Sequence, residues 1–189
     1  MQDDYVFYFV GGSGGNFLQA IVYHYLTEQD VSDCLDIENG SCHNLQFFQW
    51  VHYLEDAYPM RKTKKIVAID YEESDVLLIG IMQWFKFFKP CKPVTDRFWH
   101  KYKNLTEQEQ LDLWIKQEHQ KIVPTTNEWK KSLELLKPTY VFNFHDLFFG
   151  NINQQIAELF NRPLSDQISK FIDDYRNINL KYQDIANAV

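Results

Sequence analysis

The chain has 189 residues, of which 45% are hydrophobic and 16% aromatic, so it can bury a core without a disulfide or metal staple, which excludes intrinsic disorder. Its formal net charge of -7 argues against nucleic acid as the main partner, because binding by counterion release requires clustered Lys and Arg. We expect a single domain over residues 1–189.

Cysteine content and hydropathy indicate the compartment. The three cysteines, Cys34, Cys42 and Cys91, are an odd number without CxxC spacing, which is typical of a reducing compartment. The N-terminus lacks the basic and then apolar layout of a signal peptide, and the longest largely apolar run, Val76 to Phe85, is too short to span a bilayer. We therefore expect a cytoplasmic protein that does not bind membranes.

The chain opens with a strand, a glycine-rich turn and a helix. Tyr5 to Val10 is a short run of aromatic and β-branched residues that ends at Gly11, as expected of a central strand covered on both faces. From Asn16 to Leu26, apolar residues recur every three or four positions, which predicts an amphipathic helix. The glycine turn therefore connects the carboxyl end of a strand to the start of a helix.

Further helices and strands alternate along the rest of the chain. Apolar residues from Leu45 to Tyr53 predict a second helix that stops near Pro59, Ser74 can cap a third helix, and Thr106 with Glu109 forms a capping box for a fourth. The other expected elements are strands over 66–69 and 140–144, helices over 75–88, 106–120 and 129–137, and closing helices over 151–160 and 165–177. This alternation predicts an α/β fold with a mostly parallel sheet between layers of helices, which binds ligands at the carboxyl ends of its strands.

The glycine turn is the strongest functional signal. The segment from Gly11 to Asn16 contains four glycines in six positions, which lets the backbone take positive φ and turn several N–H groups toward one point. The positive end of the following helix dipole adds to that site, and the hydroxyl of Ser13 can donate a further hydrogen bond. A plain turn can share this composition, but the position at a strand's carboxyl end favours binding of a phosphate-like anion.

Two common nucleotide motifs are absent from this turn. A Walker A motif requires Lys and then Ser or Thr at the helix start, where this chain has Asn16 and Phe17. The GxGxxG spacing of dinucleotide-binding proteins is also missing. The turn is therefore a glycine-rich anion site of another kind.

Two blocks of the chain resemble the sulfotransferase family. The segment from Gly11, Gly-Gly-Ser-Gly-Gly-Asn-Phe-Leu, resembles the 5'-phosphosulfate loop, which reads Pro-Lys-Ser-Gly-Thr-Thr-Trp-Leu in cytosolic sulfotransferases; Ser13, Gly14, Phe17 and Leu18 match. The segment from Tyr140, Tyr-Val-Phe-Asn-Phe-His-Asp-Leu, with Asn-Arg-Pro-Leu after the next helix, is similar to that family's late strand ending in Glu-Asp-Leu. The order and spacing of the two blocks fit that fold across most of the chain.

The resemblance implies a three-layer fold of the P-loop NTPase-like, sulfotransferase-like kind. It also implies transfer of a sulfuryl group from PAPS (3'-phosphoadenosine 5'-phosphosulfate) to a hydroxyl of a small molecule or glycan. The residues that it places around PAPS are Gly11, Gly12, Ser13, Gly14, Gly15, Asn16 and Phe17.

The chain also departs from that family. The loop lysine of the family falls at Gly12, and the strand over 66–69 is followed by Asp70 rather than by the Arg of the 3'-phosphate site. Other cations could substitute for that Arg, the candidates being Lys92, Arg97, Lys101 and Arg176. Two alternatives therefore stay open: a phosphate- or nucleotide-binding module without catalysis, and a nucleotide-kinase-like phosphotransferase that requires Mg²⁺ and ATP.

Sulfuryl transfer would need a base that takes the proton of the acceptor hydroxyl. The family uses His or Glu, and we predict His43 as the catalytic base because it lies in a turn, whereas His52 lies on the predicted second helix among core-like neighbours. Cys34, Cys42, His43 and His52 match no common zinc spacing, so we expect no metal site. His145 and Asp146 lie side by side on a predicted strand end, which sends their side chains to opposite faces and argues against a dyad.

Overall fold

The computed structural model describes residues 4–36, 38, 41–42, 48–89, 102–121, 123–150, 152–161 and 163–188, and the account below concerns these residues. Four parallel strands form the main sheet in the order β4-β1-β5-β6. Their bounds are Tyr5–Tyr8 for β1, Gln49–Val51 for β4, Lys65–Asp70 for β5 and Tyr140–Asn143 for β6. A small antiparallel pair, β2 (Leu35–Asp36) and β3 (Ser41–Cys42), follows a 3-10 turn at Ser32–Cys34.

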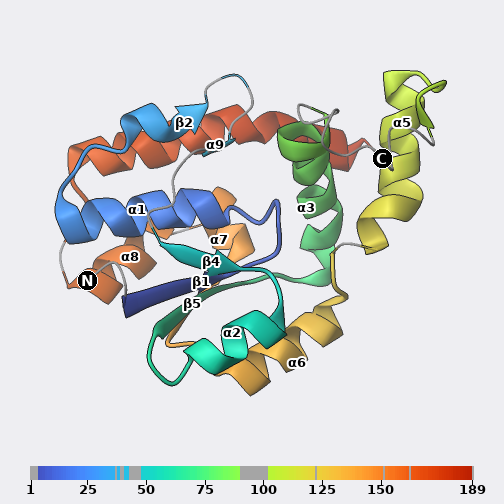
Figure 1. Cartoon of the computed structure of the whole chain (residues 1–189). Coiled ribbons are helices and arrows are strands. Elements are labelled where there is room, and N and C mark those ends of the chain that lie inside the picture. The colour runs from blue at the N-terminus through green and yellow to red at the C-terminus, as the bar shows by residue number, and fades with distance from the viewer. Residues whose placement is uncertain are drawn as a thin grey trace.

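Helices cover both faces of this sheet, as Figure 1 shows. One layer contains α1 (Gly15–Thr27), α8 (Ile152–Phe160) and the long α9 (Asp166–Asn187), and the other contains α2 (Leu54–Met60) and α6 (Thr126–Leu136). The short α7 (Phe144–Phe148) follows β6 directly. The prediction of an α/β fold with a parallel sheet between helical layers is therefore confirmed.

A further group of helices stands beside the sheet near the start of α1 (Figure 1). The 3-10 turn η3 (Glu73–Asp75) leads into α3 (Val76–Gln83), which continues as the π-helical turn η4 (Trp84–Phe88). Outside α3 lie α5 (Glu107–Leu113), the π-helical turn η5 (Trp114–Glu118) and the 3-10 turn η6 (His119–Lys121). Among the described residues, no helix combines the length and the apolar character that crossing a membrane requires.

The strand order determines where a ligand is expected. The chain moves from β1 to β4 on one side, then crosses over β1 to reach β5 on the other side, so the direction of winding reverses at β1. In open parallel sheets the crevice outside the carboxyl ends at such a reversal is the usual binding site. The glycine turn from Gly11 follows β1 at this point.

The predicted second helix, Leu45 to Pro59, is partly wrong. Residues 49–51 form strand β4, which pairs with β1, and the helix begins only at Leu54 and extends through Pro59 to Met60. Residues 43–47 lie outside the described part of the chain. Pairing with β1 is a non-local interaction, which overrides the helical spacing of the local sequence.

Three other boundaries also differ from the prediction. The chain leaves β6 at Asn143, whose side chain accepts hydrogen bonds from the backbone N–H groups of His145 and Asp146, so these two residues lie in helix α7 and not on a strand end. The cap before α3 is a reciprocal pair of hydrogen bonds between Glu72 and Asp75 rather than Ser74. The last helix runs to Asn187 instead of ending near residue 177.

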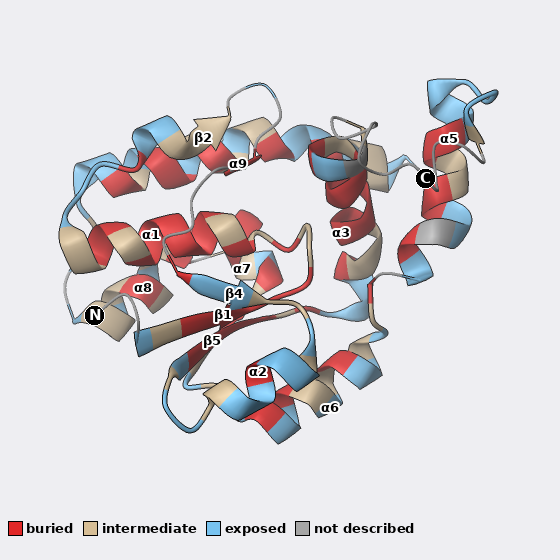
Figure 2. Cartoon of the chain, viewed as in Figure 1, coloured by how far each residue is buried: buried red, intermediate tan, exposed pale blue. Residues whose placement is uncertain are grey.

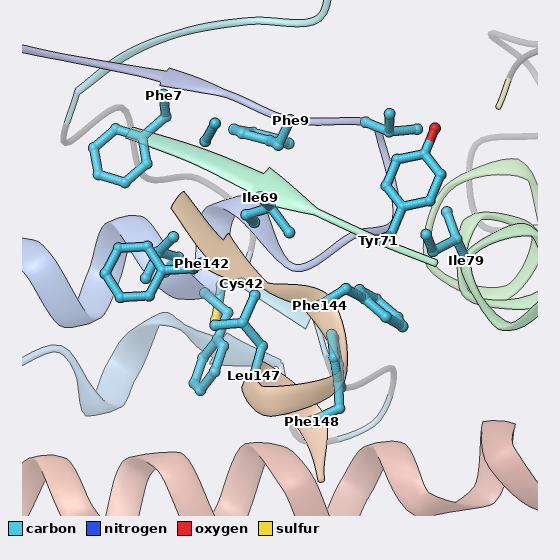
Figure 3. Packing of buried hydrophobic residues seen from close by; sticks show 14 of the residues in the cluster. Phe7, Phe9, Cys42, Ile69, Tyr71, Ile79, Phe142, Phe144, Leu147 and Phe148 are labelled. Carbon is cyan, nitrogen blue, oxygen red and sulfur yellow. The ribbon is translucent and has the colours of Figure 1, made fainter. Parts of the chain in front are cut away.

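The core lies between the sheet and the helices and is rich in aromatic rings. Figure 2 shows β1 and β5 buried along most of their length, whereas α2 and α6 expose their outer faces. Trp129 stacks on Tyr8 at 4.5 Å between ring centroids, and its indole N–H donates to the carbonyl oxygen of Ile69. Figure 3 shows Leu147 and Phe148 of α7 on the side of the sheet that faces α9.

Candidate functional site

The glycine turn makes a sharp bend that only glycine accommodates. Its first part is a turn in which the N–H of Ser13 donates to the carbonyl oxygen of Val10 at 3.1 Å. Gly12 and Gly14 have φ values of 85° and 82°, and a Cβ at Gly12 would lie 2.6 Å from Cγ of Gln83. Any side chain at Gly12 would therefore be strained by its backbone angle and blocked by α3.

The start of α1 carries no cap of its own. Its N-cap residue is Gly14, no side chain of the described residues accepts from the first-turn amides, and no acidic residue lies in that turn. The N–H groups at Gly15, Asn16 and Phe17 have no intrahelical partners, and the positive end of the helix dipole lies there. The backbone therefore offers hydrogen-bond donors to an anion at this point.

Two of the side chains predicted for this site have structural roles. The Ser13 hydroxyl is fully buried and donates to the carbonyl oxygen of Val10 at 2.6 Å, so it supports the turn. The Phe17 ring is also buried and stacks on Tyr175 at 3.7 Å, which fixes α1 against α9. Asn16 accepts a hydrogen bond from the side chain of Gln19.

A cavity of about 500 Å³ opens directly at the glycine turn. Most of the turn lines one end of it, together with the first residues of α1. The other walls come from β3, from the end of β4, from α3 with η4, and from α9, and their residues include Ser41, Cys42, Trp50, His52, Tyr53, Gln83, Lys86, Phe87 and Tyr175. The volume lies in the range of small-molecule and cofactor sites.

Lys86 supplies a positive charge beside the glycine turn. It lies in η4 and is only 8% exposed, and its amine donates to the hydroxyl of Tyr175 at 3.3 Å. That same hydroxyl lies 3.7 Å from the position of a Cβ at Gly14, so Tyr175 connects the amine to the turn. Burial lowers the pKa of Lys86 from 10.5 to about 7; the interaction with Cys42 opposes this lowering, and the charge of Lys181 adds a smaller one.

Sequence reasoning missed Lys86, although the sequence holds a signal for it. Lys86 is the only charged residue from Val76 to Phe88, and Gln83 lies three residues before it. Residues three apart share a helix face, so these two polar side chains mark one face of an otherwise apolar segment. Both line the cavity.

Two buried polar atoms on the cavity wall have no partner among the described residues. The side-chain amide of Gln83 donates to the carbonyl oxygen of Gly11, which leaves its Oε1 without a hydrogen bond. The hydroxyl of Ser41 is also buried and without a hydrogen bond. Because such atoms are usually satisfied in folded proteins, these two leave hydrogen-bonding capacity at the cavity wall.

His52 is held as a neutral base at the other wall. It follows β4 directly, and its Nδ1 lies 2.5 Å from the carbonyl oxygen of Phe9. Since a carbonyl only accepts, Nδ1 carries the proton and Nε2 keeps a lone pair. Burial lowers the pKa of His52 below 6.5, and its hydrogen bond to Phe9 opposes this in part.

Comparison of the chain with family models, curated proteins and solved structures gives no match. The site is therefore interpreted from its own residues.

The remaining predictions concern the catalytic base, the cations for the 3'-phosphate and a metal site. The predicted base His43 and three of the candidate cations, Lys92, Arg97 and Lys101, lie outside the described residues. Arg176 donates to the carbonyl oxygens of Leu147, Asp146 and Gly150, so it supports the end of α7, and it is not among the residues that line the cavity. Within the described ranges, no group of three or more His, Cys, Asp and Glu side chains could hold a metal ion.

Proposed function

We propose that the cavity binds the 5'-phosphosulfate end of PAPS and that the chain is a sulfotransferase-like, P-loop NTPase-like enzyme acting on a hydroxyl of a small molecule or glycan. The observation that carries this proposal is the position of the Lys86 amine, which lines the same cavity as the glycine turn and donates to the hydroxyl of Tyr175, a group close to Gly14. The sequence resemblance left the turn without the lysine that the family places in it. Lys86 would supply the missing charge from another part of the chain.

The residues around the cavity fit such a ligand at its 5' end. The first-turn amides of α1 would donate to its charged oxygens, and Lys86 would complement the remaining charge. The two unsatisfied polar atoms, Oε1 of Gln83 and the hydroxyl of Ser41, leave hydrogen-bonding capacity for polar groups elsewhere on the ligand. When bound, PAPS would supply an activated sulfuryl group on a phosphate leaving group.

Binding of an anion would also favour the protonated, positively charged form of Lys86. With a pKa of about 7, the amine is part protonated in the absence of ligand at neutral pH. A negative group nearby favours the ammonium form and raises that pKa. Binding and protonation of Lys86 therefore reinforce each other.

His52 is the described residue best placed to accept the proton of an acceptor hydroxyl. Its Nε2 has a lone pair, it lines the cavity, and it is neutral at neutral pH. These are the properties of a general base. His43 stays a prediction for the same role.

The proposal is tested by calorimetric titration of the full chain with PAP, the desulfated product of PAPS, and with ATP plus Mg²⁺. We expect PAP to bind, and Lys86→Met to weaken its binding by about tenfold or more, since hydrogen bonds to a charged group contribute about 1.5–3 kcal/mol. Lys89→Met is the matched control, because Lys89 lies three residues further on and pairs with Glu107.

Each other outcome favours a named alternative. Preference for ATP with Mg²⁺ would replace the proposal with a nucleotide-kinase-like phosphotransferase. Binding of PAP without release of PAP from PAPS in the presence of hydroxyl acceptors would indicate a non-catalytic nucleotide-binding module. Equal effects of Lys86→Met and Lys89→Met would remove the role of Lys86.

A further inference from the structure

Lys86 has the surroundings of a reactive amine as well as those of a cation. Its amine lies 4.9 Å from the ring centre of Tyr175, 5.6 Å from that of Tyr182 and 5.7 Å from that of Phe148. The faces of these rings attract a cation, but the amine is only 8% exposed, and burial lowers its pKa to about 7, which leaves a fraction of the side chain as the neutral, nucleophilic amine at neutral pH. A surface lysine has almost no neutral amine under the same conditions.

The geometry also limits which molecules can reach this amine. Lys86 lines the same cavity as the glycine turn, and the hydroxyl of Tyr175 is 3.3 Å from its amine and 3.7 Å from the position of a Cβ at Gly14. A small molecule with an anionic group on the first-turn amides of α1 therefore places its neighbouring atoms beside Lys86. The anion site acts as an anchor for whatever reacts with the amine.

We propose that Lys86 is a nucleophilic lysine that forms an imine with a phosphorylated aldehyde whose phosphate binds at the start of α1. This inference rests on the anion site of the proposed function, but it needs neither PAPS nor sulfuryl transfer. It assigns the cavity a covalent chemistry with carbonyl compounds.

The step balances without any further reagent. The lone pair of the neutral amine attacks the carbonyl carbon and a C–N bond forms, while the carbon–oxygen π bond breaks and its oxygen takes a proton. Loss of this hydroxyl as water gives the imine, so one amine and one aldehyde yield one imine and one water. The hydroxyl of Tyr175, 3.3 Å from the amine, is placed to exchange a proton with the nitrogen.

The titratable side chains near Lys86 are weaker nucleophiles than its amine at neutral pH. Burial raises the pKa of Cys42 to about 12 and that of Tyr182 to about 12, and it raises the pKa of Tyr175 well above 10. These three groups are therefore protonated and weakly nucleophilic at neutral pH. The charge of Lys181, a further described group near Lys86, favours the neutral amine.

The test uses pyridoxal 5'-phosphate as the probe on the full chain, followed by borohydride, which reduces an imine to a stable amine. Peptide mass spectrometry then locates the label. We expect labelling at Lys86 to exceed labelling at Lys89 by about tenfold or more, and pyridoxal without its phosphate to label Lys86 at least about tenfold less, since the phosphate contributes charged hydrogen bonds. Excess inorganic phosphate should protect Lys86.

Two variants separate reactivity from charge. Lys86→Arg keeps a cation but has no amine that forms an imine, and Lys86→Met removes both with a side chain suited to a buried site. Both should lose the label, and Lys86→Met should lose more PAP affinity than Lys86→Arg, which keeps a cation. Lys89→Met should leave the Lys86 label unchanged.

Two results would overturn the inference. Equal labelling of Lys86 and Lys89, or equal labelling by pyridoxal and its phosphate, would show that Lys86 is no more than an ordinary lysine. If PAP binds in the calorimeter and Lys86 is unlabelled, the imine chemistry fails and the anion site stands. If neither probe binds, the proposed function fails with it.

Discussion

Two helix N-termini of this chain are built in opposite ways. At α6 the Thr125 hydroxyl accepts from the N–H of Glu128, and the Glu128 carboxylate accepts in return from the N–H of Thr125. The start of α5 repeats this arrangement with Thr106 and Glu109. The start of α1 has a glycine cap, no side-chain partner among the described residues and no acid in its first turn.

The two kinds of helix start differ in their surroundings: those of α5 and α6 are exposed to solvent, whereas that of α1 lines the cavity. The capping residues of α6 and α5 are exposed, so their own side chains satisfy the amides that would otherwise bond to water. The start of α1 lines the cavity, where Lys86 adds a positive charge to that of the helix dipole. A negative cap there would compete with an anionic ligand, so the absence of such a cap leaves these donors available to the anion that we propose.

The largest effect is expected when a carboxylate is placed at the N-cap of α1, where it would repel an anionic ligand. Gly14→Asp should lower the affinity for PAP by at least about 100-fold, because two like charges about 4 Å apart near a protein surface repel by about 4 kcal/mol. Calorimetric titration measures the loss. We expect it to exceed the loss of affinity in Lys86→Met, which removes an attraction without adding a repulsion.

Gly14→Asn is the matched control for this substitution. Asn has the same shape without the charge, and both residues tolerate positive φ better than other side chains. Either side chain crowds the ring of Phe148, which lies 3.1 Å from the Cβ position, so thermal unfolding of both variants reports the steric cost separately. Equal PAP affinity in the Asp and Asn variants would contradict an anion site at this helix end.

Local signals in the sequence predicted the capped start of α5, although the equivalent capping box of Thr125 and Glu128 at α6 was not predicted. The capping box of Thr106 and Glu109 depends on residues three apart, and the structure has both of its reciprocal hydrogen bonds. The glycine turn between β1 and α1 is equally local, because its backbone angles are a property of glycine itself. Strands β1, β5 and β6 and most of the helices were predicted for the same reason, whereas β2, β3 and β4 were not predicted.

The other side of the comparison depends on contacts between distant parts of the chain. The position of Lys86 beside Gly14 arises from the packing of η4 against α9, and Gln83 meets Gly11 across 72 residues. His52 reaches the cavity because Gln49–Val51 pairs with β1 as a strand, although its local pattern is helical. Periodicity along the chain carries no information on such pairings, so the residues of the glycine turn were predictable and their partners were not.

A change of pH tests the charge beside α1 with a smaller expected effect. Between pH 7 and 9 the affinity for PAP should fall by about tenfold, because the amine of Lys86, whose pKa is about 7, loses its proton over this window. From pH 7 to about 8 Lys86 should raise the free energy of unfolding, since the unfolded chain binds more protons at this lysine than the native chain; at higher pH Cys34 and Cys42, whose pKa values are raised in the native chain, oppose this rise. Titrations at each pH and denaturant unfolding measure the two effects.

Between pH 7 and 9, Lys86 titrates whereas the neighbouring groups of the folded protein do not. The pKa of His52 lies below 6.5, and those of Cys42 and Tyr182 lie near 12, so none of these groups titrates appreciably between pH 7 and 9. The second proton of a phosphate, with a pKa near 6, is also released below the window. Lys86→Arg should abolish the fall in affinity, and persistence of the fall in that variant would assign it to another group.

The smallest expected effect tests the capped end, at α6. Thr125→Ala should lower the free energy of unfolding by about 1 kcal/mol, the usual cost of losing a Thr cap, and should change PAP affinity little because Thr125, unlike its neighbour Pro124, does not line the cavity. The hydrogen bonds from Thr125 lower the pKa of Glu128, so removing the hydroxyl should raise that pKa toward its ordinary value, as measured by NMR titration. Thr125→Ser retains the hydroxyl and should behave as the parent chain. A loss of PAP affinity in Thr125→Ala alone would mean that the two helix ends are coupled, and the contrast between a capped end for stability and an open end for binding would no longer hold.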